Sequence, residues 1–190
     1  MTTIYLFGSA APPVFEVGTV IRDLQSRGAD VCLGLTPTAA DWLHDDLEPL
    51  EELTGHPVRF QYKRPGEPDV WPRADVVLFA PVTANSLNSW ALCLTTAFVV
   101  GVVAEGMGKG IPTVAVPCVN SAYAAHPQID RSVETLRAAG VTVLYGEGGF
   151  TPNQPGTQRA YPWRTAVDAA LRAAAQVMGQ PAPTHPSDRS

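Results

Sequence analysis

Small, hydroxyl-bearing and amide side chains follow four predicted strands, at the points where each strand ends and a helix begins. These segments are Gly8-Ser9, Thr36-Pro37-Thr38, Thr83-Ala84-Asn85-Ser86 and Asn120-Ser121. Neutral hydroxyl and amide groups beside the N-terminus of a helix can bind a phosphate or another polar group through hydrogen bonds. The pattern favours a site for a polar or anionic ligand, although ordinary turns and helix caps produce the same local pattern.

Two common phosphate-binding motifs are absent from the sequence. No Gly-x-Gly-x-x-Gly follows the first predicted strand, and no Gly-Lys-Ser or Gly-Lys-Thr occurs. A standard dinucleotide fingerprint and a P-loop are therefore both excluded. A mononucleotide such as FMN remains open as the ligand.

The stretch around Pro81 illustrates how one of these strand ends is built. Residues 76–80 are apolar without alternation, which is typical of a strand covered on both faces in a parallel sheet. Pro81 cannot donate a hydrogen bond to a neighbouring strand, so it suits the exit of the strand. Thr83, Asn85 and Ser86 follow, and any of them could cap the next helix.

Strand-like and helix-like segments alternate along the chain, which predicts a doubly wound, Rossmann-like or flavodoxin-like α/β fold with a parallel sheet. The predicted strands are 4–7, 31–35, 58–62, 76–80, 112–116 and 141–145. The predicted helices are 17–24, 38–43 with Thr38 as its cap, 49–54, 87–105, 127–136 and 163–178. Because ligands of such sheets bind beyond the carboxyl ends of the strands, we expect the four polar segments to lie together.

Residues 1–178 are predicted to form one domain, and residues 179–190 a disordered tail. The loop 146–162 is rich in glycine and proline and is long enough to act as a lid or to cover an edge. The run 97–104 is apolar on all sides. Such a helix is buried either in the core or between subunits.

The composition predicts a globular protein, because 45% of the 190 residues are hydrophobic and 16% are charged. The net charge of -5 disfavours nucleic acid and gives no attraction for an anionic membrane surface. Three isolated cysteines without a Cys-x-x-Cys pair indicate a reducing compartment, and no metal site is expected. No signal peptide and no bilayer-spanning run is evident, so we expect a cytoplasmic protein.

Three segments in order resemble the flavoprotein family of homo-oligomeric flavin-containing cysteine decarboxylases, over residues 3–145. Gly8-Ser9-Ala10-Ala11 resembles the Gly-Ser opening loop of that family. Pro81-Val82-Thr83-Ala84-Asn85-Ser86 resembles its Pro-Ala-Ser-Ala-Asn-Thr motif. Pro117-Cys118-Val119-Asn120, followed by His126-Pro127, resembles its Pro-x-Met-Asn segment.

The resemblance implies FMN as the cofactor, with its phosphate near Gly8, Ser9 and residues 36–38 and its ring against residues 81–86. An amide donates and accepts hydrogen bonds at once, so Asn85 suits the polar edge of a flavin. The predicted cofactor residues are Gly8, Ser9, Ala10, Thr36, Thr38, Pro81, Val82, Thr83, Asn85, Ser86 and Thr95, and the predicted substrate residues are Cys118 and Asn120.

The resemblance also implies a homo-oligomer, a trimer or a multiple of trimers, with FMN at a subunit boundary. The alternatives are that Asn85 is only a helix cap, Ser9 only a turn residue and Cys118 only a small buried hydrophobe.

The connector before the central strand departs from the family. Decarboxylating members have a catalytic histidine there, and an ungapped count from Pro81 places that position at Glu67. An ionised carboxylate only accepts hydrogen bonds, so it cannot simply replace an imidazole. Glu67 and Asp69 are the candidate catalytic residues, as a base or as a site for a cationic substrate. The alternative is two solvated loop carboxylates.

Taken together, the residues and the resemblance predict an FMN-binding flavoprotein, an oxidoreductase or decarboxylase-like lyase that acts on a small molecule or a peptide terminus. A flavin-prenyltransferase-like enzyme is one alternative, for which Lys109, Arg159 and Arg164 are candidate basic residues. A non-catalytic flavin-binding regulatory subunit is the other, and the missing histidine supports it.

Overall fold

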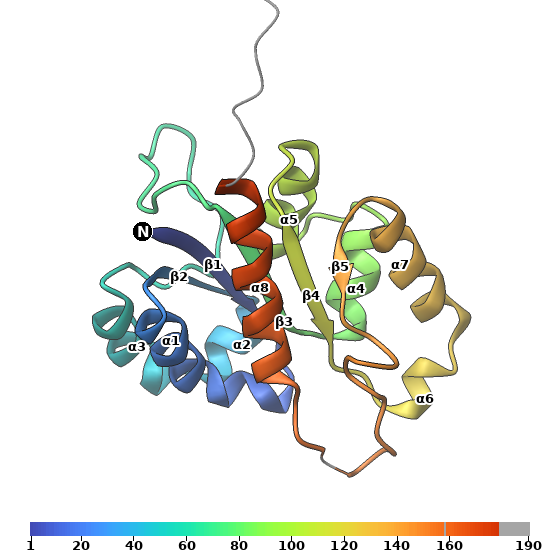
Figure 1. The fold of residues 1–190 in the computed structure, drawn as a ribbon. Helices are drawn as coiled ribbons and strands as arrows, with labels where there is room; N and C mark the ends of the chain where they lie inside the picture. The colour runs from blue at the N-terminus through green and yellow to red at the C-terminus, as the bar shows by residue number, and fades with distance from the viewer. Residues whose placement is uncertain (158, 179–190) are drawn as a thin grey trace, which may run out of the picture.

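Five parallel strands form one sheet in the order β2-β1-β3-β4-β5 in the computed structural model, which describes residues 1–157 and 159–178 (Figure 1). The strands are β1 (Thr2–Gly8), β2 (Ala29–Leu35), β3 (Val76–Val82), β4 (Thr113–Pro117) and β5 (Thr142–Val143). Every residue of β3 is buried, as its unbroken apolar run predicts. The predicted doubly wound, flavodoxin-like fold is confirmed. The predicted tail, residues 179–190, lies outside the described residues.

Helices cover both faces of the sheet (Figure 1). Helices α1 (Val17–Ser26) and α8 (Trp163–Met178) lie on one face, and α4 (Ala84–Ala91), α5 (Phe98–Gly108) and α7 (Pro127–Ala138) lie on the other. The shorter helices are η1 (Pro12–Glu16), α2 (Pro37–Trp42), η2 (His44–Asp46), α3 (Leu47–Thr54) and α6 (Ser121–Ala124). Among the described residues, no helix is both long enough and apolar enough to cross a membrane.

The helix predicted over residues 87–105 is wrong, because the structure has two helices, α4 and α5, there. Cys93, between them, has a φ of 56°, a left-handed conformation that ends the first helix. The β-branched Thr95 and Thr96 follow, and the second helix begins at Phe98. Half of the all-apolar run 97–104 joins the core of its own subunit, since Phe98, Val99, Val100 and Val103 are buried there and the other four residues are partly exposed.

Two predicted strands are shorter in the structure, and one cap is displaced. Residues 58–62 contribute only an isolated bridge between Arg59 and Gly34, since Pro57 precedes them and a connector rich in proline and glycine follows. The last strand has two residues because it lies at the edge of the sheet and pairs only with β4. Thr36, and not Thr38, caps α2, with Pro37 at the first helical position that proline favours.

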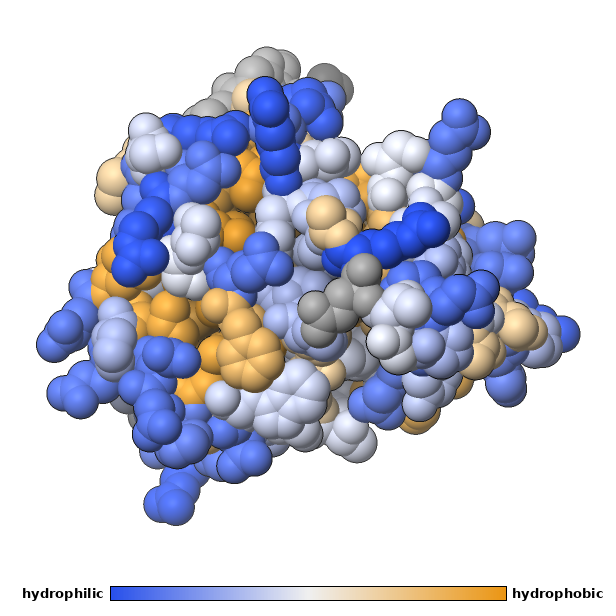
Figure 2. Space-filling model, turned by 90° about the horizontal axis from the view of Figure 1, so that it is seen from below, coloured by the Kyte–Doolittle hydropathy of each residue, from blue (hydrophilic) through white to orange (hydrophobic). Residues whose placement is uncertain are grey.

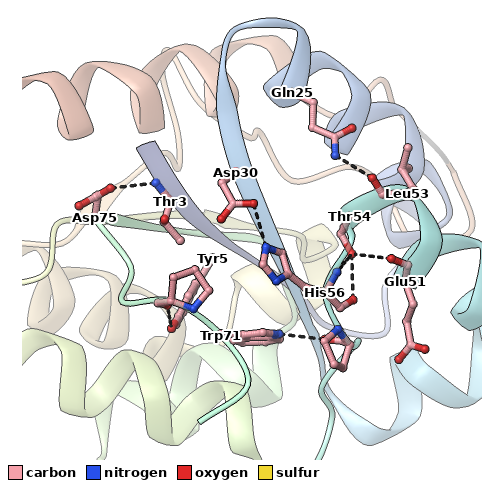
Figure 3. A network of polar contacts seen from close by, with 12 residues as sticks. Thr3, Tyr5, Gln25, Asp30, Glu51, Leu53, Thr54, His56, Trp71 and Asp75 are labelled. Atoms are coloured by element: carbon pink, nitrogen blue, oxygen red, sulfur yellow. Dashed lines mark hydrogen bonds and ion pairs between the residues drawn. The ribbon is translucent and has the colours of Figure 1, made fainter. Parts of the chain in front are cut away.

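Side-chain hydrogen bonds join the chain after α3 to strand β2, to helix α3 and to itself (Figure 3). His56 Nε2 lies 2.8 Å from Asp30 Oδ1, and Val58 N donates to Glu51 Oε1 at 2.8 Å. Trp71 Nε1 donates to the carbonyl oxygen of Pro57 at 2.9 Å. These bonds hold a segment without regular secondary structure in a defined place beside β2 and α3.

Candidate functional site

A cavity of about 1430 Å³ opens at the carboxyl ends of β1, β3 and β4. Its walls include Ala10 and Ala11 after β1, Ala84 and Asn85 after β3, and Cys118, Val119 and Asn120 after β4. Figure 2 shows this end of the molecule, where apolar surface lies among hydrophilic side chains. Three of the four polar segments therefore meet at this cavity, and the fourth, residues 36–38, follows the neighbouring strand β2 at the same edge of the sheet. Such an edge is where parallel sheets bind ligands.

Backbone hydrogen bonds set the relative positions of these strand ends. Ser9 N donates to the carbonyl oxygen of Pro81 at 2.9 Å, and Thr36 N donates to that of Gly8 at 2.9 Å. Cys118 N donates to the carbonyl oxygen of Val82 at 2.8 Å. The ends of β1, β2, β3 and β4 are thereby joined in a row, so the side chains that follow them have little freedom to move apart.

Three hydroxyl groups, those of buried Ser9 and Ser86 and of half-buried Thr83, form a cluster beside the residues that line the cavity. Ser9 Oγ donates to Ser86 Oγ at 2.9 Å, and Thr83 Oγ1 donates to Ser86 Oγ at 3.2 Å. Ser9 is 1% exposed and Ser86 is 2% exposed. Three hydroxyl groups carry three protons, and the two bonds between them use two, so one proton is left for a further acceptor. A buried donor of this kind fits a ligand oxygen such as that of a phosphate.

Asparagine side chains are concentrated at this cavity: all four asparagines of the chain line it. Asn120 Oδ1 accepts from Tyr123 N at 3.0 Å and caps α6, and Asn88 Oδ1 accepts from Ser132 Oγ at 2.8 Å. Asn85 is exposed, and no side-chain hydrogen bond joins it to the described residues. Thr83 caps α4, so the alternative of Asn85 as the cap is wrong. The amide of Asn85 is available to a ligand.

Cys118 lies in the wall of the cavity and is partly buried. Loss of solvent around its sulfur raises the pKa of the Cys118 thiol to about 11. Burial likewise raises the pKa of Cys32 to about 12, whereas Cys93 is exposed. The Cys118 side chain is consequently a neutral thiol near pH 7 and behaves as a small, weakly polar group.

This protonation state predicts the order in which the cysteines are alkylated. At pH 8 we expect iodoacetamide to modify Cys93 quickly and Cys118 slowly, because the Cys118 thiolate amounts to roughly one molecule in a thousand. Since the pKa is raised, the rate at Cys118 should increase about tenfold for each pH unit between 8 and 11. Peptide mass spectrometry over time measures both rates, and equal rates at pH 8 would contradict the prediction.

The remaining predicted site residues take up different places. Gly8, Pro81 and Val82 form the strand ends, and Thr36 and exposed Thr38 begin α2. Glu67 is exposed, and its carboxylate accepts from Arg64 N at 2.8 Å. Asp69 pairs with Lys63 at 2.7 Å, which lowers the pKa of that carboxyl group. Glu67, Asp69 and Thr95 are not among the residues that line the cavity, and Asp69 and Thr95 line a second one.

Several cavity residues carry no signal in the sequence. Phe15 and Trp42 are stacked at the rim, with ring centroids 5.9 Å apart and planes inclined by 5°. Asn153 reaches the wall because residues 146–162 fold back along the end of β4, where Ser121 N donates to the carbonyl oxygen of Asn153 at 2.8 Å. Arg159, on the same loop, also lines the cavity; unlike the others, it is a candidate from the sequence, as a basic residue of the flavin-prenyltransferase-like alternative. In the part of the chain that the structure describes, no cluster of three or more acidic, histidine or cysteine side chains could hold a metal ion.

The chain is an α/β protein with a cavity lined by polar and apolar side chains at the carboxyl edge of its sheet. The chain belongs to the Flavoprotein family, whose model matches residues 2–174. The family resemblance of its motifs is thereby confirmed. No curated protein sequence matched the chain significantly.

Solved structures with the same fold include two FMN-dependent cysteine decarboxylases. TvaF, from thioviridamide biosynthesis, has a TM-score of 0.73 and 23% identity over 92% of this chain and 99% of its own. SpaF has a TM-score of 0.74 and 21% identity over 92% and 98%. A dodecameric FMN-dependent UbiX-like decarboxylase from Escherichia coli O157:H7 has a TM-score of 0.65 and 12% identity over 100% and 98%. At these identities the likeness shows that the fold is shared.

Proposed function

We propose that this protein binds FMN in the cavity at the carboxyl ends of its strands and uses it in a decarboxylase-like oxidation of a small molecule or a peptide terminus. The observation that carries the proposal is the concentration of polar side chains at the strand ends around that cavity. All four asparagines of the chain line it. The hydroxyl cluster of Ser9, Thr83 and Ser86, which has one proton without an acceptor in the cluster, lies next to lining residues Ala10, Ala84 and Asn85. Membership of the Flavoprotein family supports the choice of a flavin as the ligand.

We assign the phosphate of FMN to the ends of β1 and β2, near Ser9, Thr36 and Thr38. Hydroxyls and the first backbone N–H groups of a helix supply donors there without a lysine. The ring is assigned to residues 81–86, with Asn85 at its polar edge. When bound, FMN supplies an acceptor for a hydride or an electron pair.

The chain's own residues would bind, orient and shield the substrate. Cys118 and Asn120 are assigned to the substrate side of the cavity, and the neutral Cys118 thiol adds no charge there. The apolar side chains at the rim, Phe15 and Trp42, would keep water from the flavin. Similarity in fold to the cysteine decarboxylases TvaF and SpaF supports this class of reaction.

A homo-oligomer, a trimer or a multiple of trimers, is part of the proposal. Ala10, Asn85, Cys118 and Asn120 are the predicted residues that line the cavity. Asp69 and Thr95 line a second cavity of the same subunit instead, and Glu67 lines neither. A second copy could bring these three residues to the first cavity. The E. coli neighbour, which shares the fold, is described as dodecameric. Sedimentation velocity of the flavin-loaded protein would measure the number of subunits, and a monomer would contradict this part of the proposal.

Flavin retention tests the proposed cofactor. The purified protein should be yellow, and Asn85→Ala should weaken FMN binding about tenfold, because one ring-edge amide is lost. Ser89→Ala is the matched control, because Ser89 lies on the same helix but outside the cavity lining. Fluorescence titration with FMN measures both affinities. Failure of the wild-type protein to bind FMN at micromolar concentration would refute the proposal, and unchanged retention in Asn85→Ala would refute the role of Asn85.

Release of carbon dioxide from peptides that end in cysteine tests the reaction class separately. A flavin-loaded protein that bleaches its flavin and releases carbon dioxide with such peptides would support decarboxylation. Bound, intact flavin without carbon dioxide release would keep the cofactor assignment and remove this class of substrate.

A further inference from the structure

The start of helix α7 adds one more polar side chain to the substrate side of the cavity. His126 lines the cavity together with Asn120, and the single turn of α6 lies between them in the chain. We infer, on the basis of the proposed function, that His126 contacts the substrate and that its Nε2–H donates a hydrogen bond to a carboxylate oxygen of the bound molecule. His126 is thereby a specificity-determining residue for a substrate that carries a carboxylate.

The hydrogen bond that caps α7 fixes which nitrogen of the His126 ring carries the proton. Gln128 N donates to His126 Nδ1 at 3.1 Å. A backbone N–H only donates, so Nδ1 must be the nitrogen that accepts. The ring proton is therefore on Nε2, and within the described residues no hydrogen bond involves that atom. Beyond the helix cap, the imidazole presents one N–H donor.

Two amides in the same cavity lining are oriented in the same sense. Asn120 Oδ1 accepts from Tyr123 N at 3.0 Å, so the cap of α6 uses the oxygen of this amide. Asn88 Oδ1 accepts from Ser132 Oγ at 2.8 Å. Gln128 Nε2 donates to Ser132 Oγ at 3.0 Å, which leaves the Ser132 proton for Asn88. In both amides the oxygen is engaged, and the N–H bonds are left for the cavity.

Packing of α7 holds His126 at this place. Ser132 is 0% exposed, and its bond to Asn88 joins α7 to α4. Ile129 comes three residues after His126, hence on the same side of the helix, and it is 1% exposed and also lines the cavity. Turning His126 away from the cavity would take Ile129 out of the core. The donor of His126 is consequently in place before a ligand binds.

These three side chains determine the class of group that fits beside them. Each amide supplies two N–H bonds and the imidazole one, and the oxygens of the amides are already engaged. An ionised carboxylate, which only accepts hydrogen bonds, matches such a set of donors. The donors carry no full charge. A full positive charge would stabilise the carboxylate more than the neutral carbon dioxide that the proposed reaction forms, and would slow that reaction.

Binding of an unreactive substrate analogue to the flavin-loaded protein tests the role of His126. N-acetylserine has the carboxylate but no thiol, and N-acetylserinamide has an amide in place of the carboxylate. We expect calorimetry to show tighter binding of N-acetylserine. His126→Ser should weaken that binding about tenfold, because a hydrogen bond to a charged group is lost. Binding of N-acetylserinamide should not change.

The choice of serine separates this contact from the structural role of His126. Serine is a favourable N-cap, so the variant keeps the cap of α7, but its side chain is too short to reach the position of Nε2. The thermal midpoint should therefore stay close to that of the wild type. His44→Ser is the matched control, since His44 is exposed on η2 and lines neither cavity.

NMR of the histidine rings gives a readout independent of activity. In a ring ¹H–¹⁵N correlation spectrum of the flavin-loaded protein, His126 should carry its proton on Nε2. N-acetylserine, and not N-acetylserinamide, should move that resonance and leave the resonances of His44 in place. A proton on Nδ1 of His126, or an unmoved resonance at a saturating concentration of N-acetylserine, would overturn the assignment.

The remaining outcomes separate His126 from the other candidate contacts. Equal affinities of the two probes for the wild type, or of N-acetylserine for the wild type and His126→Ser, would also overturn the assignment. Weaker FMN binding in His126→Ser would assign the imidazole to the flavin instead. Loss of the carboxylate preference in Arg159→Gln alone would assign the carboxylate to Arg159. A colourless protein that binds N-acetylserine through His126 would refute the FMN proposal and leave this contact standing.

Discussion

Replacing Phe7 with alanine is expected to lower the free energy of unfolding by about 4 kcal/mol, which is the usual cost of removing a fully buried phenylalanine. Phe7 is 0% exposed and packs against Phe79, Phe98 and Trp71, with ring centroids 6.0 to 6.4 Å away. The neighbouring strand cannot fill the space, because Gly34 lies against the ring. A Cβ at Gly34 would come within 2.6 Å of the Phe7 ring. The cavity left by the missing Phe7 ring would therefore remain empty.

Urea denaturation measures this loss, and Phe15→Ala supplies the comparison. Phe15 has the same side chain but is 60% exposed, so its removal should change the free energy of unfolding by less than about 1 kcal/mol. Similar losses in the two variants would mean that the aromatic cluster around Phe7 does not contribute to the core as its burial indicates.

Thr38→Asp is expected to weaken FMN binding strongly while leaving riboflavin binding unchanged. Thr38 is exposed in the first turn of α2, beside the proposed phosphate position. A carboxylate there would repel the phosphate by about 2 kcal/mol, or a roughly 30-fold rise in the Kd for FMN. Riboflavin has no phosphate, so its Kd should not change. Fluorescence titration with both flavins measures the difference.

The same substitution carries its own folding control. Aspartate in the first turn of a helix interacts favourably with the helix dipole, so the thermal midpoint of the protein without flavin should stay the same or rise slightly. A parallel loss of FMN and riboflavin affinity would place the phosphate elsewhere. Weaker FMN binding that persists at 1 M salt would also count against simple charge repulsion, because salt screens exposed charges.

Most regular elements could be predicted from the order of the residues alone. The unbroken apolar run of β3 and the stripe Val17, Val20, Ile21 and Leu24 of α1 are both buried as their spacing predicts. Such patterns are reliable because a helix buried on one face has apolar residues at the helical period, and a strand buried on both faces has an unbroken apolar run. Alternation of strands and helices then restricts the sheet to a parallel, doubly wound arrangement.

The boundaries of helices and strands could not be predicted from the sequence where local preference and tertiary packing disagree. Apolar residues run through the segment between α4 and α5, so periodicity alone extends one helix across it. The structure ends the first helix at a left-handed Cys93 and begins the second on Phe98, whose ring packs against Phe7. That contact joins residues far apart in the chain, so it cannot be predicted from a local sequence pattern.

The sequence by itself determined which polar segments follow the strands, and therefore that polar side chains gather at one edge of the sheet. Only the tertiary structure decided which side chains share a cavity. It gathers all four asparagines at one site, leaves Glu67 and Asp69 outside it, and sets Arg59 against Phe98 and Trp71. The physical reason is that residue type and spacing govern local conformation, whereas the meeting of distant side chains depends on strand order and on where the connecting loops pack.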